Sequence, residues 1–143
     1  MARVKINLPT TKIFTCQIQV TISHINYGNH VGNDAMVSIL HEARVQWLTA
    51  LKLSELNVGG ASLIMADLMV AYKAEAFYGD TLMVDVYLGE TNPINFELYY
   101  KITASRNEQI ILIALAKTGM VYFNYDLKKI TTAPLAFASI LTN

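Results

Sequence analysis

The chain has 143 residues, of which 53% are hydrophobic and only 15% are charged. Its 11 basic and 11 acidic residues balance, so bulk charge gives no case for nucleic-acid binding. A single cysteine excludes an intrachain disulfide framework and fits a reducing compartment. The N-terminus lacks the apolar segment of a signal peptide, and the longest strongly apolar run, 110–116, is too short to span a bilayer. We therefore expect a cytoplasmic protein with one domain, residues 1–143, part of whose apolar surface is buried against another copy.

The first half of the chain predicts a strand, a polar loop and a long helix. Residues 15–22 alternate strictly, with Cys16, Ile18, Val20 and Ile22 on one face. The loop 23–34 follows and leads into a helix that runs to about Leu51, with Asn33 or Asp34 as its N-cap. The helix is apolar over so wide a face that a sheet should cover most of it; its central stripe is Met36, Leu40, Ala43, Trp47 and Leu51.

The second half predicts strands joined by short turns. The extended segments are 62–77, 82–88, 96–102 and 109–125, separated by turn residues at 79–80, 92–93 and 106–108. The run 110–116 does not alternate, which predicts that both of its faces are covered. A short helix is expected after Pro134. Short turns favour an antiparallel meander, and with the long helix they predict an α+β two-layer domain.

Several common sites are excluded by their missing residues. The stretch 41–45 begins like a zinc-protease motif, but Val45 stands where the second histidine is required. The scattered histidines and single cysteine make no convincing metal site, and no Gly-rich phosphate loop is present. Cys16, on the apolar face of the first strand, is better explained as a core thiol than as a nucleophile. We expect neither a metal nor a cofactor.

The loop and three later segments resemble one known family. Residues 24–33 read His-Ile-Asn-Tyr-Gly-Asn-His-Val-Gly-Asn and resemble the D-x-D-x-x-G-H-V-N-N loop of the hotdog-fold acyl-CoA thioesterases, in particular the 4-hydroxybenzoyl-CoA thioesterase-like group. Residues 40–44 are similar to the F-x-E-A-R of the family's central helix, 78–82 to its x-G-D-x-L segment, and 117–121 to its last strand. The resemblance implies a hotdog fold, a long central helix wrapped by an antiparallel β-sheet. It also implies an acyl-CoA substrate and a homodimer or homotetramer with sites formed between subunits.

The loop departs from the family at its catalytic carboxylate. The second Asp of the family's loop corresponds to Asn26, and the first corresponds to His24. Asparagine cannot act as a general base, although it can orient a water or polarise a carbonyl. We therefore predict that Asn26 and His30 position the water or thioester and that Glu42 supplies the base, with Asp34 as its rival.

The predicted substrate-binding residues lie in the same loop and at the start of the helix. The two glycines would allow close backbone approach or positive φ, and amides near the second one would hold the thioester oxygen. The set is Tyr27, Gly28, Gly32, Asn33 and Asp34. Each catalytic candidate also has a purely structural explanation. Asn26 can bond its own backbone in a turn, His30 can stabilise the loop, and Glu42 can be a solvated side chain.

The resemblance predicts an acyl-CoA thioesterase, which hydrolyses an acyl thioester to free acid and coenzyme A. An alternative is a non-catalytic acyl-CoA or acyl-carrier-protein binding protein of the same fold, which the asparagine at the carboxylate position favours. A third is a hydratase or dehydratase, which would need an acidic residue and a histidine poised together, a pair that the loop itself lacks. Four basic residues are candidates to contact the phosphates of coenzyme A: Lys73, Lys101, Arg106 and Lys117.

Overall fold

The computed structural model describes residues 3–142. In chain order its elements are the strand β1 (Lys12–Gln19), the 3-10 turn η1 (Ile22–His24), the helix α1 (Asn33–Ala50), the strands β2 (Ser62–Tyr72), β3 (Thr81–Thr91), β4 (Asn95–Arg106), β5 (Gln109–Asn124) and β6 (Lys129–Ile130), and the helix α2 (Leu135–Thr142). The predicted short helix after Pro134 is present as α2. No helix among the described residues is long and apolar enough to cross a membrane.

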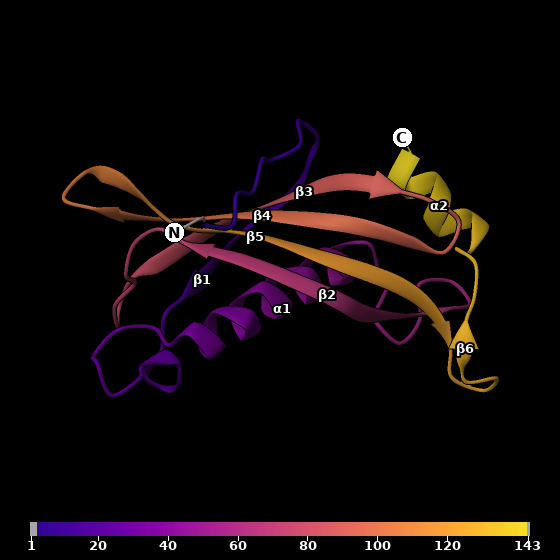
Figure 1. Ribbon diagram of the computed structural model, residues 1–143, viewed down its shortest axis with the longest axis horizontal. Coiled ribbons are helices and arrows are strands. Elements are labelled where there is room, and N and C mark those ends of the chain that lie inside the picture. Colours follow the sequence, from indigo (N-terminus) through magenta and orange to yellow (C-terminus); the bar gives the residue numbers. More distant parts are fainter. Residues whose placement is uncertain (1–2, 143) are drawn as a thin grey trace.

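The strands form one antiparallel sheet in the order β1-β3-β4-β5-β2, with β6 added to β5. The helix α1 lies across one face of this curved sheet, and α2 lies at the end of the molecule opposite the loop that precedes α1 (Figure 1). The predicted α+β arrangement, one long helix against an antiparallel sheet, is confirmed.

The meander holds for β3, β4 and β5 but is wrong for β2. This strand pairs with β5 at the far edge of the sheet, so the connection 73–80 must cross from one edge strand to β3. This connection is not a hairpin turn, because it is long and the two strands that it joins are not neighbours in the sheet. It brings residues 73–76 to the start of α1, where the backbone N–H of Val31 donates to the carbonyl of Ala76.

The core lies between α1 and the sheet. Seven helix residues are buried along one wide face, and all but Arg44 belong to the apolar face that the sequence predicts: Met36, Ile39, Leu40, Ala43, Arg44, Trp47 and Leu48. They pack against inward-facing residues of the three central strands, among them Leu82, Val84, Val86, Leu98, Ile102, Ile113 and Met120. Burial of this apolar face, more than intrinsic helix propensity, holds α1 in place.

The first strand was predicted about three residues too late. Its pairing with β3 runs from Lys12 to Gln19, opposite Tyr87 to Thr81, and stops where β3 begins. The chain then turns into η1, so Ile22 leaves the apolar face and its side chain is 74% exposed. Alternation in the sequence continued past the point where a partner strand was available.

The broken alternation in β5 has a different cause from the predicted one. Ile102 pairs with Ala114 and Thr103 pairs with Leu112, so Ile113 is the extra residue of a β-bulge. The bulge turns both Ile113 and Ala114 into the core, whereas Ile110 is exposed. The prediction that both faces of 110–116 are covered is therefore wrong for this chain on its own.

Candidate active site

A cavity of about 310 Å³ lies beside the N-terminus of α1, where the loop 24–34 meets the connection 73–80. It is lined from both segments and from the end of β2: His30, Val31, Asn33, Met36, Tyr72, Lys73, Ala74, Glu75 and Ala76. Of the predicted site residues, the lining includes His30 and Asn33. Its volume is at the lower end of the range usual for small-molecule sites.

The loop is closed on itself by backbone bonds. Ile25 and Val31 form an isolated antiparallel bridge, and the N–H of Asn26 donates to the carbonyl of His30 at 2.9 Å. Asn29 takes a left-handed backbone conformation with φ +66°, which asparagine tolerates better than most residues. These bonds therefore fix the position of His30 beside the N-terminus of α1.

Asn26 makes the local bond expected of a turn residue. Its Oδ1 accepts the N–H of Gly28 at 2.9 Å. A Cβ on Gly28 would lie 3.2 Å from His30 Nε2, and a Cβ on Gly32 would lie 2.6 Å from Asp34 Oδ1. At both positions a side chain would crowd a neighbouring polar group, so glycine is needed for the close approach of the backbone to that group. Gly32 has φ −67°, and Gly28 is not among the described positive-φ residues.

The N-terminus of α1 has no side-chain cap within residues 3–142. The N-cap is Gly32, and Asn33 and Asp34 already lie in the first turn, so the prediction that one of them caps the helix is wrong. The N–H of Gly32 is used by the carbonyl of His24. The amides of Asn33, Asp34 and Ala35 have no hydrogen-bond partner in the described chain, because the first N–H groups of a helix have no carbonyl one turn earlier. These amides and the helix dipole suit a developing oxyanion.

One hydrogen bond fixes the orientation of the His30 ring. Its Nδ1 lies 3.0 Å from the carbonyl of Val31, and since a carbonyl can only accept, Nδ1 carries the proton in this contact. The neutral ring then has an unprotonated Nε2, which lies 3.9 Å from Glu75 Oε1. That separation is too long for a hydrogen bond but close enough for the carboxylate to stabilise an imidazolium. The His30 side chain is 29% exposed and lines the cavity.

The connection 73–80 is fixed from two sides. The carbonyl of the bulge residue Ile113 accepts the N–H groups of both Lys73 and Ala74. The Arg106 guanidinium donates to the carbonyl of Glu75 at 2.7 Å and to the Asp80 carboxylate at 2.6 Å. The hydrogen bond from Arg106 lowers the pKa of Asp80. The bulge and this ion pair together place Lys73 and Glu75 at the cavity.

Six of the eight predicted site residues lie outside the cavity lining: Asn26, Tyr27, Gly28, Gly32, Asp34 and Glu42. Tyr27 is at the exposed tip of the loop. Glu42 accepts a hydrogen bond from Gln46 at 2.7 Å and lies about 13 Å along the helix from Asn33, at 1.5 Å rise per residue. Within one chain its carboxylate therefore does not reach His30, and its role as the base stays a prediction.

A second histidine–glutamate pair lies further along α1. His41 Nε2 is 2.5 Å from Glu55 Oε1, and the buried Arg44 donates to the other oxygen of Glu55 at 2.9 Å. Arg44 also reaches the hydroxyl of Tyr100, which bonds Thr118. Burial alone would raise the pKa of Glu55, but the hydrogen bonds from Arg44 and His41 outweigh burial and lower it. The cluster ties the helix to the loop 54–57 and to the sheet.

Two polar cavity residues, Tyr72 and Glu75, were missed as site residues by sequence reasoning, whereas Lys73 was predicted only as a candidate contact of the coenzyme A phosphates. Tyr72 donates its hydroxyl to the carbonyl of Asn33 at 2.8 Å, and Lys73 and Glu75 follow directly. The only sequence signal was the cluster of polar side chains at the end of a long apolar strand. Among the other basic candidates, Arg106 and Lys117 are held in ion pairs with Asp80 and with Asp67 and Glu97.

Among the described residues, neither Cys16 nor a cluster of metal ligands forms a second reactive site. Cys16 is half-buried, and burial, together with the charges of Glu42 and Asp85, raises the pKa of its thiol. In residues 3–142 no cluster of three histidine, cysteine or acidic side chains is placed to hold a metal ion.

Comparison with known proteins places this geometry in a family. Residues 20–141 match the model of the Thioesterase-like superfamily, whereas a search of curated proteins gave no match. A 1,4-dihydroxy-2-naphthoyl-CoA thioesterase from Synechocystis is 25% identical, with 91% of this chain and 96% of that chain covered and a TM-score of 0.80.

Two further solved structures share the fold at lower identity. A DHNA-CoA thioesterase from Staphylococcus aureus is 17% identical over 88% of this chain and 84% of its own, with a TM-score of 0.76. A mutant 4-hydroxybenzoyl-CoA thioesterase, with aspartate replaced by asparagine and complexed with 4-hydroxybenzoyl-CoA, is 14% identical over 90% and 97%, with a TM-score of 0.79. The predicted hotdog fold is thus confirmed, and the chain belongs to the Thioesterase-like superfamily.

Proposed function

We propose that the protein hydrolyses an acyl-CoA thioester to a free acid and coenzyme A. The observation that carries the proposal is the cavity at the N-terminus of α1, which is lined by His30 and by Asn33 in the first turn of the helix, where the backbone amides lack hydrogen-bond partners in the described chain. The family match supports thioester chemistry, and the named relatives act on aromatic acyl-CoA thioesters.

The proposed reaction assigns each group one task. A water oxygen attacks the thioester carbonyl carbon, while the amides of residues 33–35 bind the carbonyl oxygen as it gains negative charge. His30 Nε2 takes the proton from the water, and Glu75 stabilises the resulting imidazolium. The carbon–sulfur bond then breaks, and the imidazolium returns the proton to the thiolate of coenzyme A. In this proposal Lys73, which lines the cavity, contacts a phosphate of the coenzyme A half of the substrate.

The assay for this proposal follows thiol release from a panel of aliphatic and aromatic acyl-CoA thioesters. We expect turnover with at least one member and a large loss of kcat in His30→Gln. If kcat falls in Glu42→Gln while His30→Gln is unaffected, the base lies on the helix, as the sequence predicted, and the assignment to His30 is wrong. A panel with no thiol release would contradict hydrolysis altogether.

The alternative is a protein that binds acyl-CoA or an acyl-carrier protein without turnover. Two observations favour it: Asn26 at the position of the family's carboxylate, and a related enzyme whose Asp-to-Asn mutant is complexed with its substrate. Saturable binding of acyl-CoA by calorimetry, without thiol release over hours, would select this function over the first.

The pairing of His30 with Glu75 bears on the third function. A hydratase needs an acidic residue and a histidine poised together, and the structure supplies the acidic partner from outside the loop. Loss of enoyl-CoA absorbance without thiol release would identify hydration. Unchanged absorbance would exclude a hydratase.

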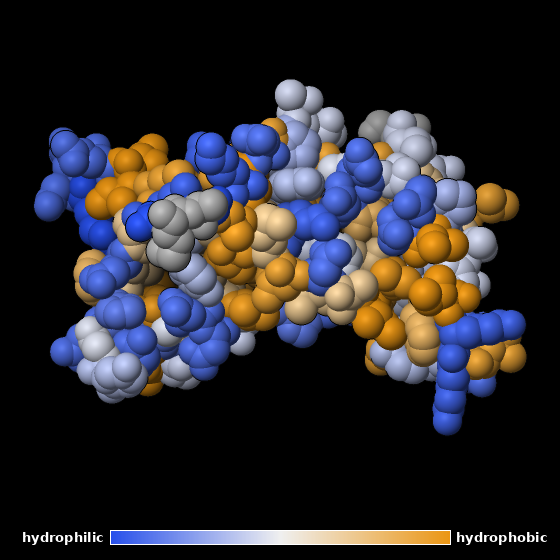
Figure 2. All heavy atoms as spheres, viewed as in Figure 1, coloured by the Kyte–Doolittle hydropathy of each residue, from blue (hydrophilic) through white to orange (hydrophobic). Residues whose placement is uncertain are grey.

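We also propose that the protein is a cytoplasmic homodimer or homotetramer. The edge strand β2 leaves four large apolar side chains partly exposed: Met65, Leu68, Met69 and Tyr72. Figure 2 shows hydrophobic side chains over β2 and β5 between hydrophilic ones. An exposed edge strand with apolar side chains is a template for pairing with another chain. Light scattering on the eluted protein should give a dimer or tetramer mass, and a monomer mass would contradict the proposal.

A further inference from the structure

A second cavity, of about 420 Å³, lies at the opposite end of the molecule from His30, between the β3–β4 turn and α2. Its walls are mostly apolar, with Pro93, Ala133, Leu135, Ala138 and Leu141, and its polar lining is neutral: Thr91, Asn92, Tyr122, Thr132 and Thr142. No charged residue of the described chain lines it. At about 30 Å³ per water-sized group, it has room for roughly a dozen non-hydrogen atoms.

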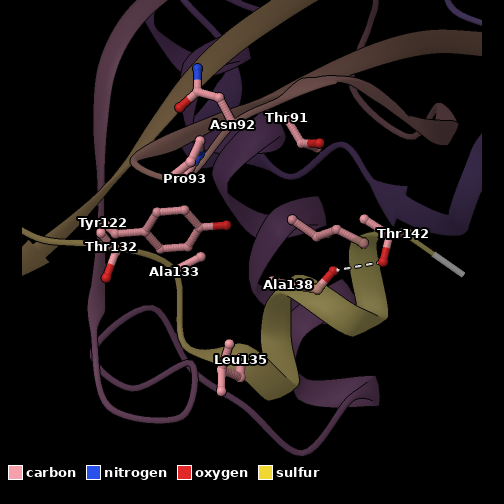
Figure 3. A pocket seen from close by; sticks show the side chains of 10 residues that line it. Thr91, Asn92, Pro93, Tyr122, Thr132, Ala133, Leu135, Ala138 and Thr142 are labelled. Carbon is pink, nitrogen blue, oxygen red and sulfur yellow. Dashed lines mark hydrogen bonds between the residues drawn. The ribbon is translucent and has the colours of Figure 1, made fainter.

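The hydroxyl of Tyr122 faces this cavity and has no hydrogen-bond partner among residues 3–142. The residue is 1% exposed. No fully enclosed side-chain nitrogen or oxygen in the described chain lacks a partner, so this oxygen must reach the cavity. Figure 3 shows it pointing into the space between the β3–β4 turn and α2.

Packing alone does not explain a tyrosine at this position. The ring belongs to an aromatic cluster, with centroids 5.6 Å from Phe96 and 6.0 Å from Phe137, and a phenylalanine would make the same contacts. The hydroxyl is not fully enclosed and opens to the cavity, so a molecule bound there can accept its hydrogen bond. Its presence here therefore points to a partner that comes from outside the chain.

The chemistry of the hydroxyl restricts that partner. Burial raises the pKa of Tyr122 to about 12, so at neutral pH the phenol keeps its proton and can donate it. A carbonyl or ether oxygen is the complement of a phenol donor. A carboxylate is disfavoured, because no cation lines the cavity to offset its loss of hydration.

We infer that the cavity under α2 binds a small neutral molecule with an apolar body and one carbonyl or ether oxygen, which accepts a hydrogen bond from Tyr122. The site is separate from the proposed thioester site, because the helix α1, about 27 Å long, lies between them. Trp47, near the far end of that helix, lies 6.1 Å from Phe137 of α2 by ring centroids.

The test uses 2-octanone, a neutral ketone with an unbranched apolar body, titrated into ¹⁵N-labelled protein and followed by amide chemical shifts. We expect saturable shifts at Ala138, Leu141 and Thr142 and none at His30. Tyr122→Phe should raise the dissociation constant about fivefold to tenfold, which corresponds to the loss of one hydrogen bond worth about 1 kcal/mol. Tyr125→Phe, at an exposed tyrosine outside the cavity, is the matched control and should leave the constant unchanged.

Two results would overturn the inference. One is an absence of saturable shifts in α2, and the other is equal affinity for 2-octanone in the wild type and in Tyr122→Phe. Octanoate is the charged comparison, and binding as tight as that of 2-octanone would also overturn the inference, because the inferred ligand is neutral. Because Tyr122→Phe removes a single oxygen from a packed ring, its thermal unfolding should match the wild type. Thiol release by this variant should also be unchanged, so failure here is distinguishable from failure of the proposed hydrolysis.

Discussion

Residues 3–142 contain two histidine–glutamate pairs, and the pairs differ in how many of their polar atoms have hydrogen-bond partners. In the pair His41–Glu55 both carboxylate oxygens have partners, one from the histidine and one from the buried Arg44. In the pair His30–Glu75 the two side chains stand 3.9 Å apart, and the histidine keeps an open acceptor nitrogen beside a cavity. A fully bonded pair stabilises the fold, whereas a pair that is close but not bonded can accept a proton from a third molecule.

The sharpest test of this comparison replaces each histidine in turn. His30→Gln should lower kcat/KM for the best thioester about 100-fold to 1000-fold, because it removes a general base. His41→Gln should leave kcat/KM within about twofold, since its ring is engaged with Glu55 away from the proposed site. Equal losses in steady-state thiol release from the two variants would erase the distinction.

The bonded pair should matter for stability instead. Arg44→Ala leaves Glu55 and the hydroxyl of Tyr100 without their buried donor, and we expect the free energy of unfolding to fall by about 3 kcal/mol. Lys5→Ala, at an exposed lysine, is the control and should change it by less than about 0.5 kcal/mol. Urea unfolding measures both, and a loss for Arg44→Ala no larger than the control would show that the cluster does not stabilise the fold.

Replacing Glu75 of the pair His30–Glu75 should reduce activity less than replacing His30. Glu75→Gln keeps the shape of the side chain but removes the charge that stabilises the imidazolium of His30, so kcat should fall about fivefold to tenfold. Stability should hardly change, because the carboxylate is largely exposed. Glu108→Gln, at an exposed glutamate in the β4–β5 turn, is the matched control. A kcat unchanged by Glu75→Gln would mean that this carboxylate takes no part in the reaction.

The smallest expected effect concerns the ion pair between Asp80 and Arg106, which holds the connection that carries Glu75. This effect depends on pH. The pKa of Asp80 is lowered by Arg106, so their ion pair stabilises the fold fully above the ordinary carboxyl pKa and less as pH falls through the lowered value. Asp80→Asn should cost about 1 kcal/mol at pH 7, and the difference should shrink as pH falls below the ordinary carboxyl pKa of about 3.9. Asp126→Asn, at an exposed aspartate, should show no such window in urea unfolding. A difference independent of pH would exclude ionisation of Asp80 as its cause.

The sequence alone determined the features that depend on local pattern. Wide apolar periodicity located α1 almost to the residue, and alternation located β3 and β4, because each pattern follows from the geometry of its own element. The loop motif identified the family and selected His30, since closely spaced polar and glycine residues before a helix can be read without knowing their neighbours.

Only the tertiary structure decided which distant segments meet. Pairing of β2 with β5 sends the connection 73–80 across the sheet, and this places Glu75 beside His30, which is 45 residues earlier in the chain. The bulge at Ile113 and the unpartnered hydroxyl of Tyr122 likewise depend on strand register and on the position of α2. Such contacts are set by the packing of the whole core, so no local pattern in the sequence could have announced them.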